Sequence, residues 1–153
     1  MNQLKILNNN EKKEIVKKLN EQFGINEISG IITRMGKERL FLFSGSFNNN
    51  EISKLEKIVN IERVGVYFAK LVPDENKIRL NIEGTQLLKD QIKKNIFELK
   101  SEQVEQWMRG QELNIKTGKK DFLVMKFGGD FLGCGKASAE KISNFIPKSR
   151  RLK

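Results

Sequence analysis

Short apolar runs separated by glycine, asparagine and proline recur along the chain, and this rhythm constrains the fold more than any other feature. Residues 11–23 carry Ile15, Leu19 and Phe23 at helical spacing. Lys77–Ile82 instead alternates strictly between polar and apolar side chains, as a half-buried strand does. Helical and strand periodicities that follow one another in this way predict an α+β fold.

Local signals place the other N-terminal elements. Asn8-Asn9-Asn10 predicts a helix cap before residue 11, and Gly24 predicts the end of that helix. Gly36-Lys37 predicts a tight turn, and the strand after it, Leu40–Phe43, is apolar throughout, which favours burial on both faces. The remaining expectations are a strand over 28–35, loops at 44–46 and 48–50, a helix over 50–59, a strand over 63–72, a turn at 73–76, and a helix over 84–93 with Leu87, Leu88 and Ile92 inward.

The rhythm changes near Lys93-Lys94-Asn95, where the elements become shorter and the glycines denser. We therefore predict a domain boundary there, with one domain over residues 1–93 and a second over 94–153. In the second, Ser101 is the expected N-cap of a single helix that presents Val104, Trp107 and Met108 and ends at Gly110. Strands are expected over 95–99, 112–115, 122–127, 141–145 and 149–152, which together indicate a small β-barrel.

Charge is distributed unevenly between these two parts. The chain has a net charge of +10, and residues 93–153 hold 14 Lys and Arg against 7 Asp and Glu. This excess favours a polyanionic partner for the C-terminal part. A lysine-rich surface that is simply solvated explains the charge equally well, so charge alone leaves both interpretations open.

Several kinds of catalytic or ligand site are excluded by composition. The chain has no histidine, which excludes Ser-His and Cys-His triads, and its single cysteine excludes a Cys-based structural zinc site. Paired-carboxylate chemistry stays open, but Glu102 and Glu105 lie among lysines and are better interpreted as solvating a helix. Gly118-Lys119-Lys120 lacks the rest of a phosphate-binding loop, and Gly133-Cys134-Gly135 lacks the third glycine of a dinucleotide motif.

Cys134 lies between two glycines with no histidine to activate it, so we predict a buried, inert thiol. These observations together predict no enzymatic activity, no cofactor and no bound metal. No apolar run is long enough to span a bilayer or to act as a signal peptide, so we expect a soluble, cytoplasmic protein without membrane contact.

The C-terminal tail is the strongest local signal for a binding site. Four of the last six residues, Lys148 to Lys153, are basic. Arginine binds phosphate with two parallel hydrogen bonds, lysine adds a mobile charge, and the Ser149 hydroxyl can donate to a phosphate oxygen. A frayed, solvated terminus is the alternative. Phe145, Ile146 and Leu152 favour a pinned tail, since apolar side chains would anchor it to a core.

The C-terminal residues also resemble a known family. Trp107-Met108-Arg109-Gly110, Glu112-Leu113 and Gly129-Asp130-Phe131-Leu132-Gly133-Cys134-Gly135-Lys136 are similar to the PUA domain, a compact RNA-binding pseudo-barrel. The ending Asn144 to Leu152 resembles that of archaeal ribosome-biogenesis proteins related to the RNA-binding extension of Nop/Sun-type RNA 5-methylcytosine methyltransferases. Arg63–Phe68 and Ile82–Gln86 are similar to the pre-PUA α/β domain that precedes PUA in such factors. The resemblance therefore implies an N-terminal α/β pre-PUA domain followed by a PUA-type β pseudo-barrel with one helix.

The resemblance implies an RNA-binding accessory protein in ribosome biogenesis, rRNA processing or tRNA modification. Its partners would be an rRNA precursor or a tRNA and, in trans, an RNA methyltransferase or ribosome assembly factor. Glu112 is a departure, because an acid on the expected RNA-facing strand over 112–116 would repel phosphate. The alternative is a protein-interaction adaptor, which a large exposed apolar patch over residues 28–82 would support. The expected RNA-binding residues are Arg109, Gly110, Lys116, Lys119, Lys120, Lys136, Lys148, Ser149, Arg150, Arg151 and Lys153.

Overall fold

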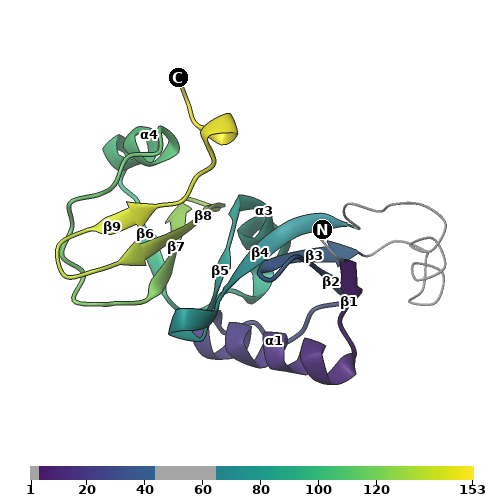
Figure 1. Cartoon of the computed structure of the whole chain (residues 1–153). Coiled ribbons are helices and arrows are strands. Elements are labelled where there is room, and N and C mark those ends of the chain that lie inside the picture. The colour runs from purple at the N-terminus through teal and green to yellow at the C-terminus, as the bar shows by residue number, and fades with distance from the viewer. Residues whose placement is uncertain (1–3, 44–64) are drawn as a thin grey trace.

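The structure of the 153-residue chain is a computed structural model that describes residues 4–43 and 65–153. The loops expected at 44–46 and 48–50, the helix expected over 50–59 and the start of the strand expected at residue 63 lie outside the described residues. Those residues form two sheets accompanied by a few helices (Figure 1). The fold is therefore of the predicted α+β class, with an N-terminal α/β region followed by a β domain.

The N-terminal sheet is antiparallel throughout, and helix α1 (Asn9–Phe23) covers one of its faces (Figure 1). Leu40 faces the core beneath α1, whereas Phe41 joins a smaller apolar cluster on the other face, so the strand that holds both is covered on two sides as predicted. The strand order is β1 (Leu4–Ile6), β2 (Ile31–Met35), β3 (Arg39–Phe43), β4 (Val66–Val72) and β5 (Lys77–Leu80).

The ends of α1 follow the sequence signals. The Asn8 side chain accepts a hydrogen bond from the Glu11 amide at 2.9 Å, and the Glu11 carboxylate accepts one from the Asn8 amide at 3.1 Å. This reciprocal pair satisfies two helix-terminal donors. Gly24 then ends the helix with a φ of 82°, a left-handed conformation that favours glycine. The predicted cap and the predicted end at Gly24 are confirmed, whereas the helix begins at Asn9, two residues before the expected start at residue 11.

The connection from the N-terminal sheet to residue 93 differs from the expected single helix over 84–93. Helix α3 (Ile82–Leu87) begins and ends earlier, and a 3₁₀ turn, η2 (Lys89–Gln91), follows it. Leu88 and Ile92 are buried as predicted, but Leu87 is 53% exposed, so its inward placement was wrong. The early end of α3 shifts the periodicity, and Ile82, Gly84 and Thr85 face the core instead.

The C-terminal sheet packs beside helix α4 (Ser101–Met108), which buries Trp107 completely. The indole Nε1 of Trp107 donates to the Leu132 carbonyl at 2.9 Å, which satisfies its one polar group. Strands β6 and β7 are parallel, whereas the other pairs are antiparallel. The strand order is β6 (Ile96–Glu98), β7 (Phe122–Phe127), β8 (Asp130–Ala137) and β9 (Ile142–Asn144).

Three local expectations in this part were wrong. Lys100, and not Ser101, is the N-cap of α4. The strand expected over 112–115 is a single bridge between Leu113 and Ile142. The strand expected over 149–152 is replaced by a 3₁₀ turn, η3 (Lys148–Arg150), after Pro147. Leu113 pairs with Ile142 of the edge strand β9, and the Leu152 amide donates to the Met108 carbonyl of α4 instead of to a strand.

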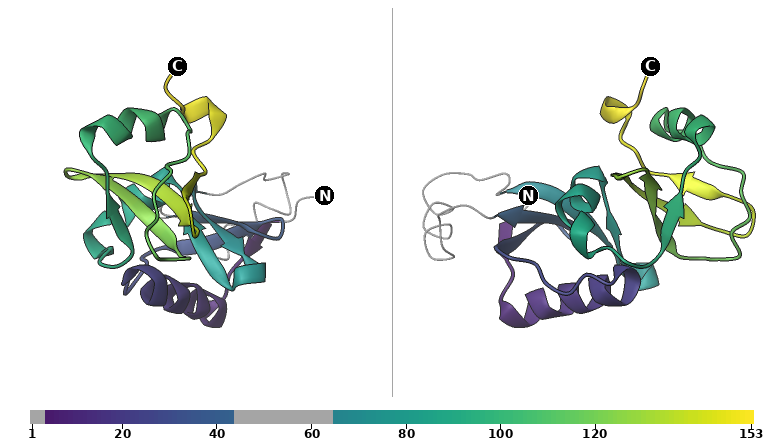
Figure 2. Two further views of the ribbon diagram at one scale, coloured as in Figure 1. Left: turned by 90° about the vertical axis from the view of Figure 1, so that its left-hand side faces the viewer. Right: turned by 180° about the vertical axis from the view of Figure 1, so that it is seen from behind.

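The two sheets share one hydrophobic core. Phe122, Val124, Phe131 and Cys134 belong to the same buried cluster as the side chains beneath α1. The Gly133 amide also donates to the Thr85 hydroxyl at 3.2 Å, which ties β8 to α3. A second cluster around Trp107 lies within the C-terminal part, together with Ile82. The further views in Figure 2 show the two parts side by side, in direct contact.

Candidate nucleic-acid interface

The C-terminal tail is held against the end of α4, and Figures 1 and 2 show η3 beside that helix in every view. The Leu152 amide donates to the Met108 carbonyl at 2.9 Å. The Asn144 side-chain amide donates to the carbonyls of Trp107 at 2.8 Å and Gln111 at 3.0 Å. These bonds join the tail to carbonyl groups in the last turn of α4 and just after it, so the tail is pinned to the domain.

The groups that anchor the tail differ in part from those expected. Ile146 is buried as predicted, but Leu152 is 52% exposed and Phe145 is 37% exposed. Arg151 acts in their place: its Nε donates to the Ile146 carbonyl at 2.9 Å, and its side chain lies directly over Gly110. A Cβ at residue 110 would overlap with that side chain. Arg151 and Gly110 therefore have a structural role in holding the tail.

The structure brings seven of the predicted RNA-binding residues together at this end of the molecule. Within them, Arg109 pairs with Glu105 at 2.7 Å, and Arg150 pairs with Glu83 of α3. Lys148 and Lys153 are exposed and form no ion pair with any residue that the structure describes. We name this group the tail patch; it consists of Arg109, Gly110, Lys148, Ser149, Arg150, Arg151 and Lys153.

The other four predicted residues do not join the tail patch. The segment between α4 and β7 runs away from the tail toward the opposite end of the C-terminal sheet (Figures 1 and 2). Lys136 lies opposite Phe122 on the neighbouring strand, where its Nζ is 4.7 Å from the Phe122 ring centre and 3.0 Å from Glu75. Lys116 pairs with Glu140 at 3.5 Å. This second group, the loop patch, consists of Lys116, Lys119, Lys120 and Lys136.

Glu112, the acidic residue on the expected RNA-facing segment, has a partner of its own. Its carboxylate is 2.5 Å from the Lys141 ammonium group. The pair is half-exposed, so its two charges largely cancel at a distance from the surface. Glu112 therefore repels a phosphate less strongly than an isolated carboxylate would.

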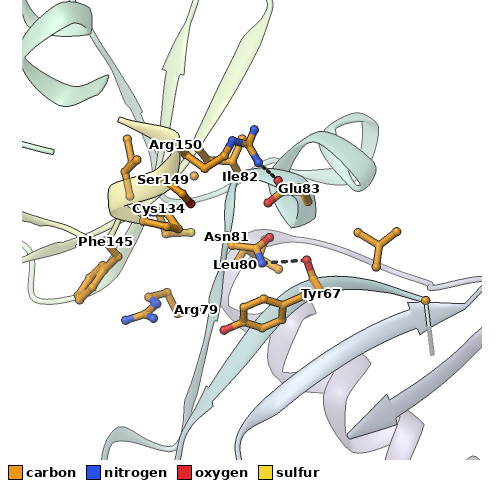
Figure 3. Close-up of a pocket in the computed structure, with 15 residues that line it drawn as sticks. Tyr67, Arg79, Leu80, Asn81, Ile82, Glu83, Cys134, Phe145, Ser149 and Arg150 are labelled. Atoms are coloured by element: carbon orange, nitrogen blue, oxygen red, sulfur yellow. Dashed lines mark hydrogen bonds and ion pairs between the residues drawn. The ribbon is translucent and has the colours of Figure 1, made fainter. Parts of the chain in front are cut away.

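A cleft of about 440 Å³ lies between the N-terminal sheet and the tail, and sequence reasoning missed it (Figure 3). Tyr67 of β4 and Arg79 of β5 line it from one side, and Phe145 and Arg150 line it from the other. The guanidinium carbon of Arg79 lies 4.1 Å from the centre of the Phe145 ring. No spacing of residues along the sequence indicates this cleft, because its lining residues come from segments far apart in the sequence.

The single thiol has the properties of a core residue. Cys134 is buried at the base of the cleft, and this burial raises the pKa of its thiol to about 12. The thiol is therefore protonated at neutral pH and is a poor nucleophile, in agreement with the predicted inert role. Among residues 4–43 and 65–153, no group of three or more His, Cys, Asp or Glu side chains could hold a metal ion. None of the described helices has the length and apolar character needed to cross a membrane.

Comparison with known proteins identifies the C-terminal domain. Residues 94–152 match the family model described as the PUA domain of the methyltransferase RsmF. No curated protein matches the chain. The matched segment contains α4, the C-terminal sheet and all of the tail patch except Lys153. The chain thus carries a PUA domain of methyltransferase type at its C-terminal end, and a domain of this type indicates RNA binding.

Proposed function

We propose that this protein is an RNA-binding accessory factor of ribosome biogenesis, or of rRNA or tRNA modification, that holds structured RNA on the basic surface of its PUA domain. The observation that carries the proposal is the position of the tail patch. It lies almost wholly within the segment that matches a PUA domain, it is pinned to α4, and it presents Lys148 and Lys153 to solvent. A pinned cationic surface binds phosphate with little loss of conformational entropy.

The two paired arginines of the tail patch also support phosphate binding. The Arg109–Glu105 and Arg150–Glu83 pairs are both half-exposed. Exposed ion pairs contribute only about 0–1 kcal/mol, so a phosphate group can replace either carboxylate at small cost. The arginine then forms a bidentate pair of hydrogen bonds with the phosphate. The arginines of the tail patch therefore add phosphate-binding groups to those of its two unpaired lysines.

The N-terminal part fits a supporting role as the pre-PUA domain that the sequence resembles. An RNA methyltransferase or a ribosome assembly factor would act with it in trans, in the cytoplasm. The protein-interaction adaptor is less well supported. Within residues 28–43 and 65–82, Val66 is the single large hydrophobic side chain that is exposed, whereas an adaptor surface in this region calls for an extended apolar patch.

A salt series tests the proposal. The purified protein is titrated with a tRNA transcript and with a precursor-rRNA hairpin at several salt concentrations. We expect the affinity for at least one of them to fall linearly on logarithmic axes as salt rises, because bound phosphates release counterions. Replacing Lys148 and Lys153 together by Ala should flatten that slope by about 1–2, since each phosphate contact contributes about 0.7–0.9.

The matched control is the double variant Lys13→Ala and Lys17→Ala on the exposed side of α1, which removes the same charge far from the tail. It should leave the slope unchanged. Equal effects of the two double variants would mean that net charge, and not the tail patch, binds RNA. A wild-type affinity that does not respond to salt would contradict the proposed function itself.

A further inference from the structure

The cleft between the two sheets has the size and composition of a ligand site. Its volume of about 440 Å³ is within the range of about 300–1,000 Å³ of small-molecule pockets. One wall comes from the N-terminal part, through Tyr67, Arg79 and Glu83, and the other comes from the C-terminal part. Ser149 and Arg150 line the cleft and also belong to the tail patch, so the two surfaces are continuous.

Flat, polarisable groups line this cleft. The Arg79 guanidinium lies over the Phe145 ring at 4.1 Å, and Tyr67 lines the same space. Phe145 stays 37% exposed, although its ring contacts that of Phe122 at a centre-to-centre distance of 6.2 Å. A planar cation stacked on an exposed aromatic ring forms a platform on which another flat ring stacks well. The chemistry of this wall matches a nucleobase.

The polar groups in the cleft are suited to a single phosphate. Arg79 and Arg150 exceed Glu83 by one positive charge among the lining residues. Arg150 is held by the exposed Glu83 carboxylate (Figure 3), a partner that a phosphate can displace. Asn81 is already committed, because its side chain donates to the Tyr67 carbonyl at 2.9 Å and accepts from the Gly84 amide at 2.8 Å. Asn81 therefore shapes the cleft and leaves ligand binding to the arginines.

We propose that this cleft holds one unpaired nucleotide of the RNA that lies on the tail patch. This inference rests on the proposed function. The base stacks against the Arg79–Phe145 platform, and its phosphate replaces Glu83 on Arg150. Since stacking on an aromatic ring tolerates every base, the site selects an unpaired nucleotide and not a particular sequence. RNA that bears a bulge or a splayed base is therefore the preferred ligand.

Two RNA hairpins test this inference. One has a fully paired stem, and the other has the same stem with a single bulged 2-aminopurine nucleotide. We expect the wild-type protein to bind the bulged hairpin about tenfold more tightly, at the lower end of the effect of one stacked base. Stacking should also quench the 2-aminopurine fluorescence. Phe145→Ala, Arg79→Ala and Arg79→Lys should each abolish the preference and the quenching, while affinity for the paired hairpin stays within about twofold.

Two features of the design separate stacking from other effects. Arg79→Lys keeps the charge and removes the planar group, so loss of the preference in this variant assigns it to stacking. Phe127→Ala is the matched control, because Phe127 is 39% exposed and does not line the cleft. It should retain both the preference and the quenching. Thermal melts of each variant show that the fold is preserved.

The outcomes are distinct. Equal affinity of the wild type for both hairpins overturns this inference and leaves the proposed function standing, whereas binding to neither hairpin overturns the proposed function. The free 2-aminopurine ribonucleotide provides the last comparison. If it displaces the bulged hairpin at concentrations near the hairpin's own dissociation constant, the cleft is a mononucleotide site and the inference is wrong. We expect no displacement at such concentrations.

Discussion

Gly110→Ala should release the C-terminal tail from the end of α4. Gly110 has a φ of +85°, where an L side chain is strained, and the Arg151 side chain occupies the space that a Cβ would need. An alanine at this position must therefore displace Arg151. That movement breaks the hydrogen bond of 2.9 Å from the Arg151 Nε to the Ile146 carbonyl.

The size of the effect follows from these two contributions. The left-handed backbone conformation costs about 1–2 kcal/mol for a residue other than glycine. The hydrogen bond from a charged group is half-buried, so we take about 1–2 kcal/mol for it, near the lower end of its usual range. Gly110→Ala should therefore lower the free energy of unfolding by about 2–4 kcal/mol.

Gly118→Ala provides a control for the backbone contribution. Gly118 has a φ of +76°, and no atom lies within 4 Å of the Cβ that an alanine would add. This variant should cost only the backbone strain of about 1–2 kcal/mol. Urea unfolding of both variants measures the difference directly. In an Arg151→Ala background, the extra cost of Gly110→Ala should disappear, so that the two glycine substitutions become equal.

Equal costs for Gly110→Ala and Gly118→Ala in the wild-type background would refute the reasoning, because they would mean that Arg151 moves aside freely. Binding provides a second readout. Displacement of Arg151 loosens the tail that holds Lys148 and Lys153, so Gly110→Ala should weaken binding of structured RNA. Gly118→Ala should leave that binding unchanged.

Two further predictions concern titratable groups. Cys134 should not react with a thiol reagent in the native protein at pH 8, and rapid labelling would contradict its burial. The free energy of unfolding should fall as pH rises from about 9 toward 12, because the thiol ionises near 9.0 in the unfolded chain and has a pKa of about 12 in the folded one. Cys134→Ala should remove this fall. A hydrogen bond of 2.7 Å from the Lys77 ammonium is the main cause that lowers the pKa of Asp121 below its ordinary value of 3.8. The stability from this pair should be present above the ordinary pKa of 3.8 and lost as pH falls through the depressed pKa. The difference in urea unfolding between Asp121→Asn and the wild type should therefore be full at pH 6 and should narrow as the pH is lowered below 3.8.

Elements with strong local signals were predicted from the sequence. The cap at Asn8, the helix that follows and its end at Gly24 depend on contacts within a few residues, so a single segment specifies them. The inward placement of Leu87 failed because the end of α3 is set by its packing against the sheets. The strand expected over 149–152 failed for a related reason. A run of suitable residues forms a strand only where a neighbouring strand offers backbone partners, and the tail pairs with the end of α4 instead.

In the candidate site, too, features set by nearby residues were predicted and features set by distant contacts were not. The tail patch was accessible to sequence reasoning, since four of its five basic residues lie among the last six positions and the PUA match covers all of the patch except Lys153. The role of Arg151 as an anchor was not, because it depends on the close approach of Gly110, which lies 41 positions earlier in the sequence. The cleft was missed completely. Tyr67 and Arg79 belong to the N-terminal sheet and Phe145 follows the last strand of the C-terminal sheet, so only packing makes them neighbours.

The shared core explains how a cleft between two parts of the chain can serve as a fixed binding site. Phe131 and Cys134 of β8 are buried in the cluster that lies beneath α1, and the Gly133 amide is bonded to Thr85 of α3. Burial of such side chains contributes about 1.5–3 kcal/mol each, whereas the exposed Arg150–Glu83 pair across the cleft contributes at most about 1 kcal/mol. The spacing of the two walls is therefore set by buried contacts. Arg150 can exchange Glu83 for a phosphate while the cleft keeps its width, so RNA meets a preformed surface.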